Sequence, residues 1–173
     1  LLNEAVSIMK GEEPESAERE CLVDMQVQAH IPESYIDSTN LRLDVYRRIA
    51  DIRSEEDALD VTDELIDRFG DPPDAMKGLI DIALLRNTAV GLHIDEIKQQ
   101  YGALLIYKQD IQMREVSELV RQMGGRVLLS AGRRPYVSVK LQNDAPIDLL
   151  NNVLRIWRSV AQNQRIKQLT VCF

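Results

Sequence analysis

The chain has few of the residues on which most catalytic and metal sites depend. Its 173 residues include two cysteines, two histidines and eight glycines, and aromatic residues make up 5%. Two cysteines cannot form a disulfide framework, which favours a reducing compartment. No apolar run approaches the ~18 residues that a membrane-spanning helix needs, and the sequence shows no secretory signal. We therefore expect a cytoplasmic, globular protein without a membrane partner.

Motifs for catalysis or cofactor binding are also missing. His30 and His93 lack the spacing, to each other or to a cysteine, that a zinc site requires. The sequence contains neither GxxxxGKS/T nor GxGxxG, and Gly124-Gly125 is typical of a helix end rather than of a phosphate cradle. We expect no metal, no cofactor and no enzymatic activity.

The net charge of −7 is divided unevenly along the chain. Residues 101–173 carry 11 Lys and Arg against 5 Asp and Glu, whereas residues 1–100 carry 10 against 23. Such an asymmetry indicates an acidic interaction surface on one part and a basic surface on the other. It also fits two halves that fold together with opposite charges on neighbouring surfaces.

Hydrophobic periodicity predicts a mixture of helices and strands. Leu41, Val45 and Ile49 recur at helical spacing, whereas residues 23–29 alternate apolar and polar side chains as in a strand. The expected helices lie at about 38–52, 54–70, 72–91, 116–123 and 144–161, and the other expected strands at 103–107, 127–129, 136–140 and 169–173. Strand pairs mixed with helices favour an α+β fold, in which a small, mostly antiparallel or mixed sheet packs with several helices.

The chain divides at an acidic segment near its start. Residues 1–10 have the pattern of an amphipathic helix, and residues 11–20 are rich in glutamate with little apolar content. That composition is typical of a solvated linker. We therefore expect a linker helix and an acidic linker over 1–20, followed by a single α+β domain over 21–173.

A stripe of charge runs along the helix expected at 54–70. Helical spacing places on one side the residues Asp57, Asp60, Glu64, Asp67 and Arg68. Such a stripe can dock on a basic partner surface, with Arg68 making a bidentate contact to a carboxylate there. It is also the pattern of an ordinary solvated helix face, and the spacing alone favours that simpler interpretation.

The basic half, residues 101–173, suggests a different partner. Binding of phosphate needs clustered cations, and binding of single strands adds aromatic side chains on which bases stack. The half contains tyrosines near its cations, but Trp157 lies on the apolar stripe of its helix, which favours core packing. The net charge of −7 also opposes long-range steering toward DNA. Nucleic-acid contact is therefore the alternative function.

Four segments, in this order and spacing, resemble the C-terminal domain of bacterial transcription-repair coupling factor. They read AHIPESYI, LRLDVYRRIA, ELIDRFGDPP and LIDIA, at residues 29–36, 41–50, 64–73 and 79–83. The strong part of the resemblance covers about residues 1–92, and the basic half fits in the order of its elements.

The resemblance implies a regulatory role. Full-length members of that family are ATP-dependent DNA translocases that displace stalled RNA polymerase and recruit excision repair. Their motor precedes this domain, so the resemblance implies that residues 1–20 link to the motor and that this fragment has no motor activity. It also implies that the domain docks on the N-terminal module, which resembles the excinuclease B subunit, and masks the surface that binds the damage-sensing A subunit (UvrA).

The resemblance also selects the contact residues. In the family the masking contacts come from the helix that reads ELIDR, which corresponds here to Glu64, Asp67 and Arg68, and Asp60 continues the same stripe. With the resemblance, the docking interpretation of this stripe is favoured over the solvated one. We expect an autoinhibitory protein-interaction domain, with the basic half as the nucleic-acid alternative and an independent enzyme as the third interpretation.

Overall fold

The computed structural model describes residues 20–171. The helix expected at 1–10, most of the linker at 11–20 and the last two residues lie outside the described part of the chain. The helices are α2 (Thr39–Ala50), α3 (Glu55–Phe69), α4 (Asp74–Gly91), α5 (Met113–Met123) and α6 (Pro146–Val171), with a 3-10 turn, η1 (Gly124–Arg126). The strands are β1 (Leu22–Asp24), β2 (Glu96–Gln100), β3 (Ala103–Tyr107), β4 (Val127–Ser130) and β5 (Tyr136–Lys140). None of the helices described here has the length and apolar character needed to cross a membrane.

The strands form one mixed sheet in the order β1-β2-β3-β5-β4. β1 pairs with β2 in parallel, and the remaining pairs are antiparallel. Ile97, Ile106 and Val137 lie opposite one another on three neighbouring strands and are fully buried. Because side chains alternate between the two faces of a sheet, this row marks the face that packs against the helices. The expected α+β fold with a mixed sheet is confirmed.

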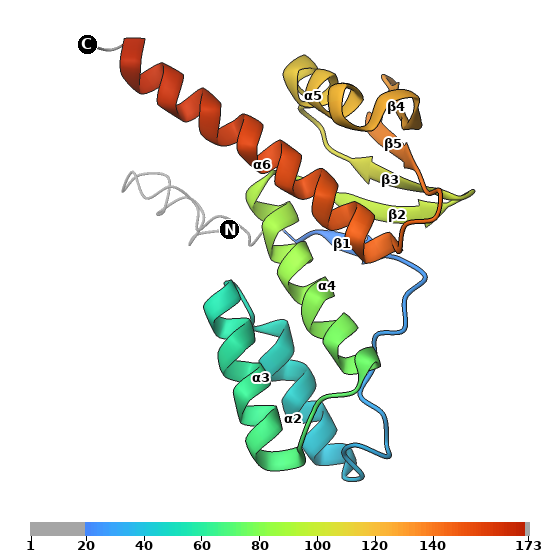
Figure 1. Ribbon diagram of the computed structural model, residues 1–173, viewed down its shortest axis with the longest axis vertical. Helices are drawn as coiled ribbons and strands as arrows, with labels where there is room; N and C mark the ends of the chain where they lie inside the picture. The colour runs from blue at the N-terminus through green and yellow to red at the C-terminus, as the bar shows by residue number, and fades with distance from the viewer. Residues whose placement is uncertain (1–19, 172–173) are drawn as a thin grey trace, which may run out of the picture.

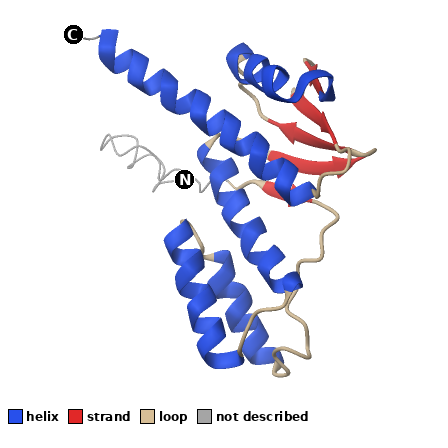
Figure 2. Ribbon diagram, viewed as in Figure 1, coloured by secondary structure: helices blue, strands red, loops and turns tan. Residues whose placement is uncertain are grey.

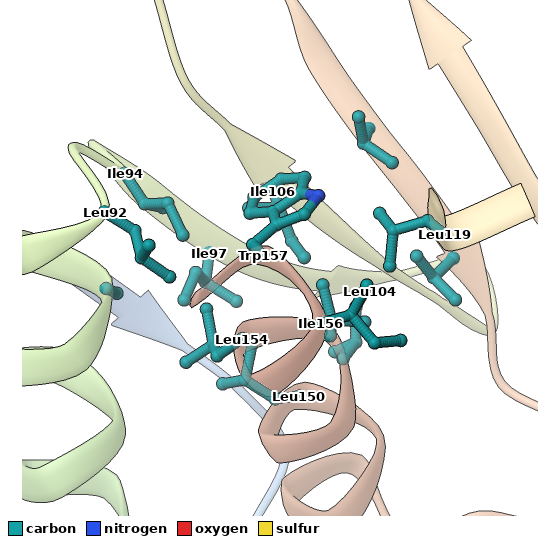
Figure 3. Packing of buried hydrophobic residues seen from close by; sticks show 14 of the residues in the cluster. Leu92, Ile94, Ile97, Leu104, Ile106, Leu119, Leu150, Leu154, Ile156 and Trp157 are labelled. Carbon is teal, nitrogen blue, oxygen red and sulfur yellow. The ribbon is translucent and has the colours of Figure 1, made fainter. Parts of the chain in front are cut away.

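One hydrophobic core lies between this face of the sheet and three helices. Figure 3 shows Leu150, Leu154 and Trp157 of α6 packed over the sheet, with Leu119 of α5 beside them. Trp157 is fully buried, and its ring N–H donates a hydrogen bond of 3.3 Å to the carbonyl of Glu115. The prediction that Trp157 belongs to the core is confirmed. We refer to residues 21–24 and 85–161, which supply this core, as the sheet unit.

A second hydrophobic core holds the first three helices together. It contains Val45 and Ile49 of α2, Leu65 of α3, and Met76 and Ile80 of α4. Figures 1 and 2 show α2 and α3 as a helical hairpin set apart from the sheet, with α4 running from the hairpin toward it. We refer to residues 31–83, which supply this core, as the helical unit.

Helix α4 belongs to both units. Its first half supplies Met76 and Ile80 to the helical core, and its second half supplies Leu85 and Ala89 to the sheet core. In its first half, at Gly78, the helix passes against the chain that follows β1. A Cβ atom added at Gly78 would lie 2.9 Å from the carbonyl oxygen of Gln28, so only glycine allows this close approach.

Three expectations about strands need correction. The strand expected at 23–29 is paired only at Leu22–Asp24, although half-buried and exposed residues continue to alternate as far as residue 29. Strand β2 was not predicted, because its sequence EIKQQ is mostly polar. The strand expected at 169–173 is wrong for its first three residues, since α6 continues to Val171.

Candidate protein-interaction site

Helix α3 begins at a capping box. The Ser54 hydroxyl accepts a hydrogen bond of 3.1 Å from the backbone N–H of Asp57, and the Asp57 carboxylate accepts one of 2.9 Å from the N–H of Ser54. The Arg53 N–H donates to the same carboxylate, and these bonds hold the pKa of Asp57 below its ordinary value. Asp57 therefore caps its own helix.

A tyrosine fixes the other end of α3. The helix stops at Gly70, whose φ of 82° suits glycine. The Tyr35 hydroxyl donates a hydrogen bond of 2.6 Å to the Gly70 carbonyl, and its ring lies 5.9 Å from the ring of Phe69. Burial, with the nearby charge of Asp71, raises the pKa of Tyr35, which further favours the protonated hydroxyl that donates this bond. With both ends fixed, α3 presents its outer side as a rigid surface.

The structure brings two of the four expected contact residues together. Arg68 donates a hydrogen bond of 2.9 Å to the Glu64 carboxylate, and Arg48 of α2 donates another to the same group. The Arg68 guanidinium also lies 5.0 Å from the centre of the Phe69 ring. Exposed ion pairs of this kind each contribute about 0–1 kcal/mol, so an outside partner can compete for them.

The other two expected residues point into solvent. Asp60 and Asp67 are exposed, and within residues 20–171 neither carboxylate has a hydrogen-bond or ion-pair partner. Asp63, which lies between them in the sequence, is also exposed, and its carboxylate likewise has no partner within residues 20–171. The structure therefore separates the stripe into a paired part, Glu64 with Arg68, and an unpaired acidic part.

Two features of this surface were missed from the sequence. Arg48 pairs with Glu64 across the hairpin, and only the basic residues near the end of α2 could have indicated it. The second feature is Ile66, an apolar residue of α3 like Ala58 and Leu65. Those two residues are buried, but Ile66 remains 41% exposed.

Four of the 11 basic side chains in residues 101–173 form ion pairs within the domain. Glu96, which is buried, pairs with both Lys98 and Arg134, and these bonds lower its pKa. Arg134 also lies over the ring of Tyr107, with 4.4 Å between the guanidinium carbon and the ring centre. Further ion pairs join Lys108 to Glu115, Arg121 to Glu118 and Arg126 to Asp144. These contacts leave less free positive charge for a nucleic acid than the sequence suggests.

Two hollows in the surface lie beside α4 and α6, near the start of α3. One of about 630 Å³ lies between the start of α3, α4 and α6, and its walls include Glu55, Asn87 and Arg158. An adjoining hollow places Asp81 near Asp148, and burial together with the Asp148 charge raises the pKa of Asp81. Among the residues described, no group of three or more His, Cys, Asp or Glu side chains is placed to hold a metal ion.

Comparison with known proteins places the chain in a family. Residues 25–119 match the sequence profile of the TRCF domain. The chain belongs to the TRCF domain family. It is 34% identical over 150 residues to the transcription-repair-coupling factor of Staphylococcus aureus (strain USA300), and 27% identical over 166 residues to that of Bacillus subtilis (strain 168). These alignments cover 84% and 92% of the chain but only 12% and 14% of the relatives.

A solved structure has the same fold as this TRCF domain. It is the crystal structure of the C-terminal domain of a transcription-repair coupling factor, with a TM-score of 0.73 and 17% sequence identity. The match covers 83% of this chain and 92% of that one. The resemblance noted in the sequence is thus confirmed: the chain belongs to the TRCF domain family and shares the fold of that C-terminal domain.

Proposed function

We propose that this TRCF domain is a non-catalytic, autoinhibitory interaction domain. It docks through α3 on the N-terminal, excinuclease-B-like module of the same factor and masks the surface that binds UvrA. The observation that supports this most directly is the acidic outer side of α3, held rigid by the capping box at Ser54 and by the hydrogen bond from Tyr35 to Gly70. A rigid surface loses little conformational freedom on binding, which favours a weak but specific contact.

The wider arrangement is part of the same proposal. Residues 21–173 form the regulatory domain, and residues 1–20 link it to the motor of a cytoplasmic ATP-dependent DNA translocase. UvrA and RNA polymerase are then partners of the whole factor rather than of this domain. Internal pairing of four of the 11 basic side chains in residues 101–173 supports protein docking over contact with nucleic acid.

A weak contact is sufficient for such a latch. A flexible tether gives an effective concentration of roughly 1 mM. At that concentration, a Kd of about 10 µM stabilises the docked state by about 2.7 kcal/mol. Engagement of the factor with polymerase or DNA needs to oppose only this amount to expose the masked surface.

The test is a titration of the domain with the N-terminal module at low and moderate salt. We expect micromolar binding that weakens as salt rises, and that the Glu64→Arg/Asp67→Arg variant loses, because both reversals place positive charge against a basic partner. An Asp24→Arg/Asp110→Arg variant is the matched control: it changes the net charge equally, in the sheet unit, and should bind like the wild type.

Two results would contradict the proposal. Absence of binding near 1 mM at low salt would exclude masking by this domain. Equal losses in both reversed variants would show a dependence on net charge rather than a docking site on α3. Retention of the domain on DNA at moderate salt would then favour the nucleic-acid alternative.

A further inference from the structure

Two large apolar side chains on α3 face solvent. Leu59 is 65% exposed and Ile66 is 41% exposed, although the residues beside them in the sequence, Ala58 and Leu65, are buried. Leu59 and Ile66 are seven positions apart, which is about two helical turns. Both side chains therefore lie on the same side of the helix. Single exposed apolar residues are common on protein surfaces, but here two of them lie on the same side of one helix.

The unpaired carboxylates lie between this apolar pair and the paired charges. At about 100° per residue, Asp63 projects next to Leu59 and Ile66, with Asp67 and Asp60 following around the helix. Glu64 and Arg68 come after them, on the flank that faces Arg48 of α2. The outer side of α3 is therefore apolar on one flank, acidic in the middle and internally paired on the other flank.

The two flanks differ in what they offer a partner. Glu64 already accepts hydrogen bonds from Arg48 and Arg68, so a partner that binds it must share or displace existing contacts. Nothing within residues 20–171 competes with a partner for Asp60, Asp63 or Asp67. Leu59 and Ile66 lose contact with water when covered, which is the larger source of affinity in interfaces of this type.

From these contacts we infer that the docking surface is centred on Asp63 rather than on Glu64. Leu59 and Ile66 fill an apolar hollow on the partner, and Asp60, Asp63 and Asp67 pair with lysine or arginine side chains around it. Glu64 acts as a positioning residue that holds Arg48 and Arg68 at the border of the contact. This inference rests on the proposed function, and the partner that covers the docking surface is the same N-terminal module.

The acidic residues indicate what kind of surface covers the apolar pair. Three free carboxylates within two turns repel one another and a second acidic copy of the helix, which disfavours self-association through this face. A basic partner surface removes that repulsion while it covers Leu59 and Ile66. Charge complementarity thus favours a basic partner surface over a second copy of α3, and the proposed function identifies that surface with the N-terminal module.

The test compares Leu59→Ser/Ile66→Ser with wild type in the same titration with the N-terminal module. We expect Kd to rise about 30-fold or more, because each side chain loses an apolar contact worth roughly a factor of ten. Glu64→Gln should raise Kd less than about threefold, since the free aspartates remain. Val120→Ser is the matched control, because Val120 of α5 is 44% exposed and lies in the sheet unit.

The outcomes separate this inference from the proposed function. If Leu59→Ser/Ile66→Ser binds within twofold of wild type while Glu64→Arg/Asp67→Arg loses binding, the centre of the contact is at Glu64 and the inference is wrong. If wild type itself does not bind, the proposed function fails. Sedimentation of the wild-type chain alone provides a further check: a dimer that the serine variant abolishes would make a second copy the occupant and overturn the inference. Unchanged thermal unfolding of the serine variant shows that it is folded.

Discussion

The helical unit and the sheet unit use charged residues in opposite ways. On the helical unit the ion pairs lie at the surface, as in Arg48 with Glu64, and the acidic middle of α3 has no partner within the described residues. In the sheet unit, Glu96, Lys108 and Glu115 are buried, and each is paired. The net charge of a region therefore does not measure the charge that is available to a partner. The acidic side of α3 exposes its charge to solvent, whereas four of the 11 cations in residues 101–173 are paired within the domain.

The largest effect on stability is expected when one buried charge of the sheet unit is removed. Lys108 pairs with Glu115, and its ammonium lies 5.5 Å from the centre of the Trp157 ring. Lys108→Met leaves the Glu115 carboxylate buried without a counter-charge, so we expect the free energy of unfolding to fall by about 3–5 kcal/mol. Denaturant unfolding followed by Trp157 fluorescence measures this change.

A second substitution shows whether the pair or the lysine alone matters. Glu115→Gln keeps an oxygen that can accept the Gln112 N–H, which now donates to the Glu115 carboxylate at 2.9 Å. Lys108→Met/Glu115→Gln should therefore recover most of the lost stability. A double variant as unstable as Lys108→Met would mean that the lost packing of the lysine side chain, rather than an unpaired carboxylate, sets the cost.

A medium effect on stability is expected at the contact between α4 and the segment that follows β1. Gly78→Ala places a Cβ against the backbone carbonyl of Gln28, and neither backbone can move without shifting α4 or the segment after β1. We expect a loss of about 1–3 kcal/mol, measured by thermal unfolding. Gly91→Ala is the control, because nothing lies within 4 Å of a Cβ added there. Equal stability of the two variants would show that the contact at Gln28 yields easily.

The smallest effect concerns pH and the hollow between α4 and α6. Asp81 faces Asp148, Glu55, Arg155 and Arg158 there, and burial with the Asp148 charge raises its pKa. The folded state therefore holds the Asp81 proton more tightly than the unfolded state, and stability falls as pH rises from the ordinary range of an aspartate through the raised pKa.

Replacing Asp81 removes this loss. Asp81→Asn should be more stable than wild type at neutral pH by no more than about 1 kcal/mol, because solvent screens the site, and the two should converge near pH 3. Thermal unfolding across pH 3–8 measures the difference. A constant difference at all pH values would assign it to hydrogen bonding of the amide rather than to charge.

Local signals made the helical unit predictable from its sequence. Ser54 with Asp57, Gly70 after α3, and the helical spacing of Val45 and Ile49 each act within a few residues, and the structure contains the helices that they predict. The sheet unit depends on contacts between distant segments. In β2, Glu96 is buried because Lys98 and Arg134 pair with it, and Arg134 lies 38 residues away. A polar strand stabilised in this way has no apolar alternation for a sequence pattern to detect.

The candidate site shows the same limit. The sequence indicated which residues of α3 are charged, but the pairing of Glu64 with Arg48 depends on how the hairpin packs. The exposure of Leu59 and Ile66 likewise follows from which side of α3 meets α2 and α4, and apolar letters alone do not reveal it. The strand expected at 169–173 is wrong for a different reason. Apolar and polar residues alternate over 169–171, but so short a pattern also fits the end of a long helix, and α6 continues through these residues.

Helix α4 has a mechanical consequence for any latch built on α3. Its 18 residues form a rod of about 27 Å that is a structural member of both cores, without a break between them. A force applied to the hairpin is therefore transmitted to the sheet through α4, without a hinge between the two cores. If α3 docks as proposed, we expect the domain to bind and leave its partner as one body, with a displacement of the whole domain and no bending within it.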